Sequence, residues 1–287
     1  MTGDTPVRVP RTPPSDSLLV VHDLGAVEPG LPRAPEVLGL FYADAVNIVA
    51  GDPGGGKTFL ALGAVVDVLA RGGQAVFVDL EDKAQTISDR LRGLGVDRSI
   101  LTESVLYVHG LGALGPSDVD WLPRWVAQCG GLVLLVIDSL SEALAMAGLD
   151  EDRAPDVTRW FQTVGRPLAA SGAAVLIIDH LAKAQGGSGG RWPRGSGHKL
   201  AAVDGLAVVL DPIQPFSRER SGSGQLIVAK DRQGAVGGRN DTVAQVIFEV
   251  VGGTCVAVRV LRTSPVEHGE ELAAPSILHR SDRGADR

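Results

Sequence analysis

Eight consecutive residues of this sequence have the composition of a phosphate-binding loop. Its glycines carry no side chains, so successive backbone N–H groups can converge on a phosphate group. A helix that begins near Lys57 would add the positive end of its dipole. We therefore expect Lys57 to bridge the β- and γ-phosphates of a nucleotide and the Thr58 hydroxyl to hold Mg²⁺. The predicted nucleotide-binding residues are Gly51, Asp52, Pro53, Gly54, Gly55, Gly56, Lys57 and Thr58.

Acidic residues lie at or just after the ends of two other apolar segments, where they could bind a metal ion and activate water. Asp138 ends the most apolar segment, residues 132–138, and a carboxylate at the end of a buried strand faces the crevice where α/β sheets bind ligands. We expect Asp138 to hold Mg²⁺, directly or through water, with Ser139 beside it. Glu81 follows residues 75–79, where it could orient or deprotonate water. A solvated acidic turn is the alternative for Glu81.

Basic residues further along the chain are the next candidates. His180 ends an apolar segment and could sense a γ-phosphate, although a structural hydrogen-bonding histidine is the alternative. No acidic residue occurs between Lys183 and Lys199, and clustered glycines predict a mobile loop there. Its cations, with Trp192 as a stacking surface, could contact a nucleic-acid backbone, or the loop could be solvated surface. The predicted nucleic-acid contacts are Lys183, Arg191, Arg194 and Lys199.

Two further cations, Lys230 and Arg232, stand one residue apart at the end of an apolar segment. Because side chains alternate along a strand, this spacing predicts that both project on one face.

These residues need a scaffold that gathers strand ends at one edge. Apolar strand patterns alternate with helical ones up to about residue 180, which predicts an α/β fold with a mainly parallel sheet. After residue 206 the strand patterns follow closely and Gly252-Gly253 predicts a tight turn, so we expect C-terminal antiparallel hairpins. The expected strands are 45–49, 75–79, 105–109, 132–138, 173–179, 206–210, 225–231, 244–250 and 254–260, and the expected helices are 58–71, 84–93, 117–128 and 154–170.

Composition narrows the class of protein. The net charge of −7 argues against wholesale coating of nucleic acid but leaves room for a local basic site. Cys129 and Cys255 lack metal-ligand spacing, so we expect reduced core cysteines. The apolar runs fall short of the ~18 residues that span a bilayer, and the N-terminus lacks a signal pattern. We expect a cytoplasmic protein without membrane contact, with disordered residues 1–16 and 264–287 flanking a domain over 17–263.

In this order, the motifs resemble those of RecA-like P-loop ATPases, specifically the RepA/DnaB-type helicase branch, over about residues 35–261. The resemblance identifies residues 51–58 as Walker A, Asp138 as the end of Walker B and Glu81 as the catalytic glutamate. It also implies that Lys230 and Arg232 reach the γ-phosphate of a neighbouring subunit. The chain departs from the replicative helicases of that branch in having only a short N-terminal arm. Residues 138–144 and 229–234 look more like those of stand-alone RepA-like ATPases of plasmids, phages and mobile elements.

The resemblance implies ATP hydrolysis with Mg²⁺ by a ring homo-oligomer, a hexamer, that depends on single-stranded DNA and works as an ATPase or helicase in replication or recombination. A RecA-like regulatory or scaffolding ATPase that gates a protein partner is the first alternative, and DNA stimulation of turnover would separate the two. A small-molecule kinase is the second, and the Lys-x-Arg strand end and the absence of an evident lid domain speak against it.

Overall fold

The computed structural model describes residues 33–110, 112–181 and 196–263. Within residues 34–263 a nine-stranded sheet has the order β3-β2-β4-β5-β1-β6-β7-β8-β9. The pairings from β3 to β6 are parallel and those from β6 to β9 are antiparallel, as expected. The strands are β1 (Ala45–Gly51), β2 (Gln74–Asp79), β3 (Val105–His109), β4 (Val133–Asp138), β5 (Ala174–His180), β6 (Leu206–Gln214), β7 (Gly222–Asp231), β8 (Thr242–Val251) and β9 (Thr254–Arg262).

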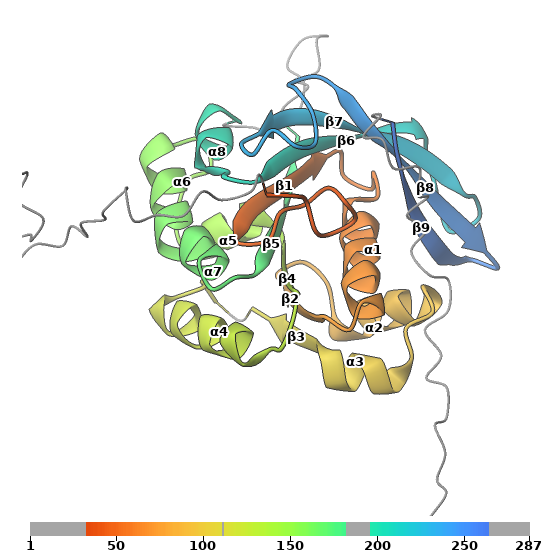
Figure 1. Ribbon diagram of the computed structural model, residues 1–287, viewed down its shortest axis with the longest axis horizontal. Helices are drawn as coiled ribbons and strands as arrows, with labels where there is room; N and C mark the ends of the chain where they lie inside the picture. The colour runs from red at the N-terminus through yellow and green to blue at the C-terminus, as the bar shows by residue number, and fades with distance from the viewer. Residues whose placement is uncertain (1–32, 111, 182–195, 264–287) are drawn as a thin grey trace, which may run out of the picture. The chain divides into compact units, whose positions relative to one another are not determined.

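Helices cover both faces of the parallel strands, with α1 and α2 on one side and α4, α6 and α7 on the other (Figure 1). A parallel sheet buried on both faces requires strands that are apolar throughout, and every residue of β4 is buried. The helices are α1 (Lys57–Ala70), α2 (Ala84–Gly93), α3 (Arg98–Ser104), α4 (Pro116–Gln128), α5 (Leu140–Met146), α6 (Ala154–Trp160), α7 (Arg166–Ala169) and α8 (Ser196–Ala202), and a π-helical segment, η2 (Phe161–Gly165), joins α6 to α7.

Strand β1 shows how alternation builds the two cores. Val46 and Ile48 pack with the helices on one face, whereas Ala45 and Val49 pack with those on the other. Asn47 is the buried polar exception: its side-chain amide donates to the carbonyl oxygens of residues 42, 45 and 175, and its side-chain oxygen accepts from the backbone N–H of residues 42 and 206. Since every polar atom of that side chain has a partner, its burial costs little.

The sequence predicted a mainly parallel sheet with C-terminal hairpins, and the structure confirms it, down to the Gly252-Gly253 turn between β8 and β9. The single helix expected over 154–170 is interrupted by the π segment, next to Pro167, which lacks the N–H that a regular helix would use there. Helices α3, α5 and α8 were not predicted. In particular, α8 replaces the end of the expected loop.

Several predictions concern residues outside this description. The predicted disordered arm (1–16), the predicted tail (264–287) and residues 183–195 of the predicted loop (183–199) are among them. Over the described ranges, no helix is long and apolar enough to cross a membrane. Both cysteines, Cys129 and Cys255, are free thiols.

Candidate nucleotide site

The glycine-rich loop connects β1 to α1, as its position after an apolar strand predicted. Gly54 and Gly56 have φ angles of 73° and 97°, a backbone conformation that glycine adopts without strain. A Cβ atom on Gly56 would lie 2.6 Å from Phe248 Cζ, whereas one on Gly54 would meet no atom within 4 Å. Gly55 N donates to Asp52 O at 3.0 Å and tightens the turn. The loop therefore needs glycine at position 56 for both its conformation and its packing.

Lys57 is buried and its ammonium contacts the base of the loop. Its Nζ donates to Gly51 O at 3.0 Å and to Asp52 O at 2.9 Å. Burial lowers the pKa of Lys57, and the carboxylates of Asp138 and Glu81 act in the opposite direction. Because this ammonium is largely shielded from solvent and lies at the base of the loop, it is well placed to bind an anionic group such as phosphate.

The two predicted metal ligands lie in direct contact. Thr58 Oγ1 donates to Asp138 Oδ2 at 2.8 Å. Asp138 is 5% exposed, and burial raises its pKa to about 6, while the hydrogen bond from Thr58 acts to lower it. A hydroxyl and a carboxylate oxygen are ligands that Mg²⁺ prefers, so this donor pair fits the predicted ion.

Glu81 lies beside this pair, held by residues from two neighbouring strands. Its Oε1 accepts a short hydrogen bond from Ser139 Oγ, just after β4, and lies 3.2 Å from His180 Nε2, at the end of β5. The hydrogen bond with His180 is the largest cause that lowers the pKa of Glu81, and burial opposes it. Asp79 shapes the turn before Glu81 by accepting from the backbone N–H of residues 81 and 82. The arrangement keeps Glu81 ionised and oriented.

A cavity of about 340 Å³ brings the predicted residues together. Its lining includes Lys57, Thr58, Asp138, Glu81 and His180, which come from α1 and from the ends of β2, β4 and β5. Among the other loop residues, Pro53, Gly54 and Gly56 also line it.

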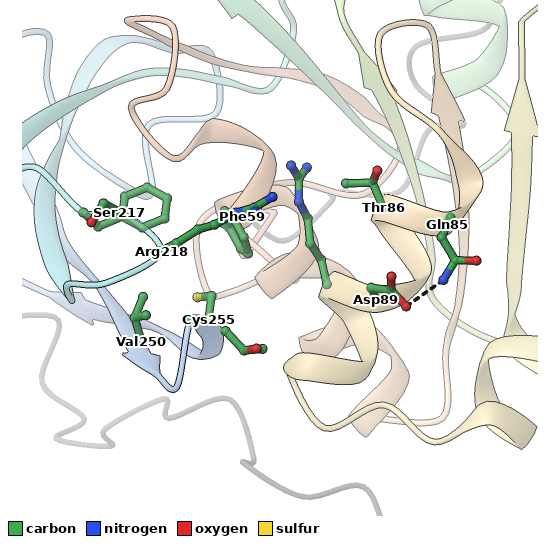
Figure 2. Close-up of a pocket in the computed structure, with 12 residues that line it drawn as sticks. Phe59, Gln85, Thr86, Asp89, Ser217, Arg218, Val250 and Cys255 are labelled. Atoms are coloured by element: carbon green, nitrogen blue, oxygen red, sulfur yellow. Dashed lines mark hydrogen bonds between the residues drawn. The ribbon is translucent and has the colours of Figure 1, made fainter.

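A second cavity, of about 420 Å³, shares Phe59, Arg90 and Phe216 with the first. Figure 2 shows Phe59 between the α2 side chains on one side and Ser217 and Arg218 on the other. The Arg90 guanidinium lies 5.2 Å from the Phe59 ring centroid, and Phe216 meets Phe59 edge-on at 5.4 Å and stacks on Phe248 at 4.6 Å. Sequence reasoning missed this group. Its only signal was the scarcity of phenylalanine, six in the chain, of which these three meet here.

The prediction that Lys199 contacts nucleic acid is wrong. Its side chain is fully buried on α8, and Nζ lies 3.0 and 2.9 Å from the two carboxylate oxygens of Asp179 and 3.2 Å from Glu151 Oε2. An ammonium closed off from solvent by two carboxylates does not reach a phosphate backbone. The other three predicted contacts, Lys183, Arg191 and Arg194, lie outside the described residues.

Lys230 also differs from its prediction. Instead of projecting beside Arg232, its Nζ donates to the carbonyl oxygens of Leu200 (2.6 Å), Ala201 (3.4 Å) and Val203 (2.6 Å), and burial lowers its pKa. The free carbonyls at the end of α8 attract it. Arg232 is exposed and, in the part of the chain that the structure describes, does not line the nucleotide cavity. Its action on a neighbour stays a prediction.

Comparison with known proteins gave one family. A family model described as an AAA domain matches residues 11–186, which is more than half of the chain. The matched range includes the glycine-rich loop, Glu81, Asp138 and His180, and it ends before α8. No curated protein matches the sequence at a significant level.

Proposed function

The chain belongs to the AAA-domain family, and on that premise we propose that it is a RecA-like, Mg²⁺-dependent ATPase that works as a ring of identical subunits. The family supports a nucleotide-hydrolysing ATPase in general. The observation that carries the proposal is the group of side chains in one cavity: Lys57 for phosphate, the Thr58–Asp138 pair for the metal ion and Glu81 for water.

Each side chain has one task in this proposal. The loop amides and Lys57 bind the phosphates, and Thr58 and Asp138 hold Mg²⁺, which neutralises phosphate charge when it is bound. Glu81 orients the attacking water and accepts its proton, a task that requires the ionised carboxylate. Ser139 and His180 hold that carboxylate in place.

The second cavity supports a place for the nucleobase and sugar. It continues from the phosphate cavity through Phe59, Arg90 and Phe216, and its volume of about 420 Å³ is within the range of small-molecule sites. Aromatic faces and a guanidinium are groups on which a planar base stacks. We propose ATP as the nucleotide.

The finer part of the proposal concerns the ring and DNA. We propose that Arg232, exposed at the end of β7, reaches the γ-phosphate bound by the next subunit, as in the RepA/DnaB-type branch. Lys183, Arg191 and Arg194 remain the proposed contacts to single-stranded DNA, and replication or recombination remains the proposed setting. Lys230 is no longer proposed to reach a neighbouring γ-phosphate, and Lys199 is no longer proposed to contact DNA, because both ammonium groups bind partners within their own chain.

The burial of Lys199 also favours the alternative of a regulatory ATPase, since it removes one of four cations from the DNA set. The test is the steady-state ATPase rate with and without single-stranded DNA, with Lys57→Ala as the control for contaminating activity. We expect the rate of the wild type to rise with DNA. A rate that is measurable but the same with DNA would replace the DNA-dependent role by the regulatory one.

A further inference from the structure

Helix α8 is held at its middle and at its C-terminal end by Lys199 and Lys230, the two lysines that the sequence analysis had assigned to DNA and to a neighbouring nucleotide. Near its middle, Lys199 forms an ion pair with Asp179 in which neither side chain is exposed, and Glu151 makes a second contact. At its end, Lys230 donates to three carbonyl oxygens, in and just beyond the last turn. We call these contacts of Lys199 and Lys230 the α8 clamp.

One side of the clamp leads to the catalytic carboxylate. Asp179 is the residue before His180, and the backbone N–H of His180 donates to Asp179 Oδ1 at 2.9 Å. His180 Nε2 in turn contacts Glu81 at 3.2 Å. The position of Lys199 therefore fixes the end of β5 at the point where His180 turns towards the nucleotide cavity.

The other side of the clamp leads to Arg232, the proposed finger, by which we mean the cation that reaches the γ-phosphate bound by the next subunit. Lys230 lies two residues before Arg232 on the same strand end, and the backbone N–H of Arg232 donates to Gly205 O at 3.1 Å, three residues after α8 ends. The chain after α8 is anchored on β1, where Val46 N donates to Asp204 Oδ1 at 2.7 Å. Arg232 is thus tied to the helix from its own strand and from the segment that follows the helix.

We propose that the α8 clamp is a joint that sets the position of Arg232 relative to His180, with Lys199 and Lys230 as positioning residues. The inference rests on the proposed function, because His180 holds the Glu81 that acts at the subunit's own nucleotide, whereas Arg232 is assigned to the nucleotide of the neighbour. Through the joint, the state of one site biases the finger that this subunit offers to the next. The buried Lys199–Asp179 pair suits this task. Breaking it would leave a buried charge without a partner, so states in which the pair is only partly separated are disfavoured.

The first test is hydrogen–deuterium exchange of the full-length protein without nucleotide, which does not depend on hydrolysis. Lys199→Met and Lys230→Met should each speed the exchange of backbone amides 199–203 by about tenfold, because each releases one contact of α8. Lys83→Met is the matched control, since Lys83 is exposed at the start of α2, and it should leave these amides unchanged. Unchanged exchange in both clamp variants would overturn the proposal.

The second test separates positioning from stability. Lys199→Met leaves Asp179 as an unpaired buried charge, whereas Lys199→Met combined with Asp179→Asn removes both charges. The double variant should recover most of the melting temperature lost in the single variant. Its kcat should stay about tenfold below that of the wild type, with nucleotide affinity unchanged, because the phosphate loop is intact. Recovery of both stability and kcat would reduce Lys199 to a structural role and overturn the proposal.

The failure of the joint and the failure of the proposed function give different results. A wild type without ATPase activity would refute the proposed function. If the wild type is active but neither Lys199→Met nor Lys230→Met changes the exchange of the α8 amides, the joint alone is refuted. Lys230→Arg adds a check, since a guanidinium can still donate to the α8 carbonyls and should restore slow exchange.

Discussion

Thr58 Oγ1 donates a hydrogen bond of 2.8 Å to Asp138 Oδ2, which joins the start of α1 to the end of β4 across 80 positions of the sequence. The contact places a hydroxyl and a carboxylate side by side at the nucleotide cavity, on two elements whose apolar residues are largely buried. A metal ion bound here would replace the hydrogen bond between these two side chains, and its positive charge would favour the ionised form of Asp138.

The first prediction is a pH dependence of metal binding at Asp138. Burial raises the pKa of Asp138 to about 6 in the metal-free protein, so a proton competes with Mg²⁺ below that pH and no longer competes above it. The apparent affinity for Mg²⁺-nucleotide should therefore fall by up to about tenfold per pH unit below 6 and level off above it. Titration with MgADP at several pH values measures this.

Asp138→Asn is the control for that prediction, because an amide cannot take up the proton. Its affinity should be weak at every pH and should follow only the ionisation of the nucleotide itself. If wild type and Asp138→Asn showed the same pH profile, the carboxyl of Asp138 would not be the group that competes.

The second prediction separates binding from turnover. Lys57→Ala should lose tight nucleotide binding, since its ammonium is the cation held at the base of the loop. Glu81→Gln should bind nucleotide nearly as well as the wild type but should stop turnover, because Glu81 acts on water during the reaction. Nucleotide titration and steady-state rates on both variants are the measurements. Normal turnover by Glu81→Gln would exclude Glu81 as the group that activates water.

The third prediction uses two glycines of the same loop as a matched pair. Gly54→Ala and Gly56→Ala both place a side chain at positive φ, a strain of about 1–2 kcal/mol. Gly56→Ala adds a Cβ 2.6 Å from the buried Phe248 ring, whereas Gly54→Ala opens onto free space. Chemical unfolding should therefore show a larger loss of stability for Gly56→Ala. Equal losses would mean that the Phe248 ring yields without cost.

The nucleotide loop could be predicted from the sequence because its chemistry is contiguous. Residues 51–58 carry the pattern themselves, and a strand that is apolar throughout announces a buried parallel sheet whose carboxyl ends meet. Asp138 ends one such strand and Glu81 follows another, so placing them near Thr58 required no long-range information. The structure brings these residues to one cavity.

The roles of Lys199 and Lys230 could not be predicted, because their partners lie on other elements. Lys199 stands in a glycine-rich segment without acids, which is typical of an exposed loop, yet Asp179 is 20 positions away and pairs with it in the core. The partners of Lys230 lie 27 to 30 positions away, at the end of a helix that no strong periodicity predicted. The second cavity was missed for the same reason, since Phe59 and Phe216 are far apart in the sequence and meet only in the folded chain.

The fourth prediction concerns assembly. A finger that acts in trans on a phosphoryl group is worth ~10³–10⁵ in rate, so Arg232→Ala alone should be nearly inactive. Mixing it with Lys57→Ala should restore part of the activity, because one protomer keeps an intact nucleotide loop and the other keeps the finger. The ATPase rate against mixing ratio measures this. Mixed rings that form without any gain in rate would place Arg232 in cis or outside catalysis.

The last prediction concerns the proposed DNA contacts, now without Lys199. An acidic chain, with a net charge of −7, gains little from diffuse attraction to DNA, so any affinity must come from a concentrated group of cations. If Lys183, Arg191 and Arg194 each pair with a phosphate, single-stranded DNA binding should show a log–log salt slope of roughly −2 per protomer.

Arg191→Ala combined with Arg194→Ala should flatten that slope to about −0.7 and abolish DNA stimulation of the ATPase, because one of the three cations is left. The DNA-free rate should stay near that of the wild type, since neither arginine belongs to the group of residues assigned to the nucleotide. Affinity measured over a range of salt concentrations, together with ATPase rates with and without DNA, tests both statements. A double variant with the slope and stimulation of the wild type would remove DNA from the proposal and leave a regulatory ATPase whose partner is a protein.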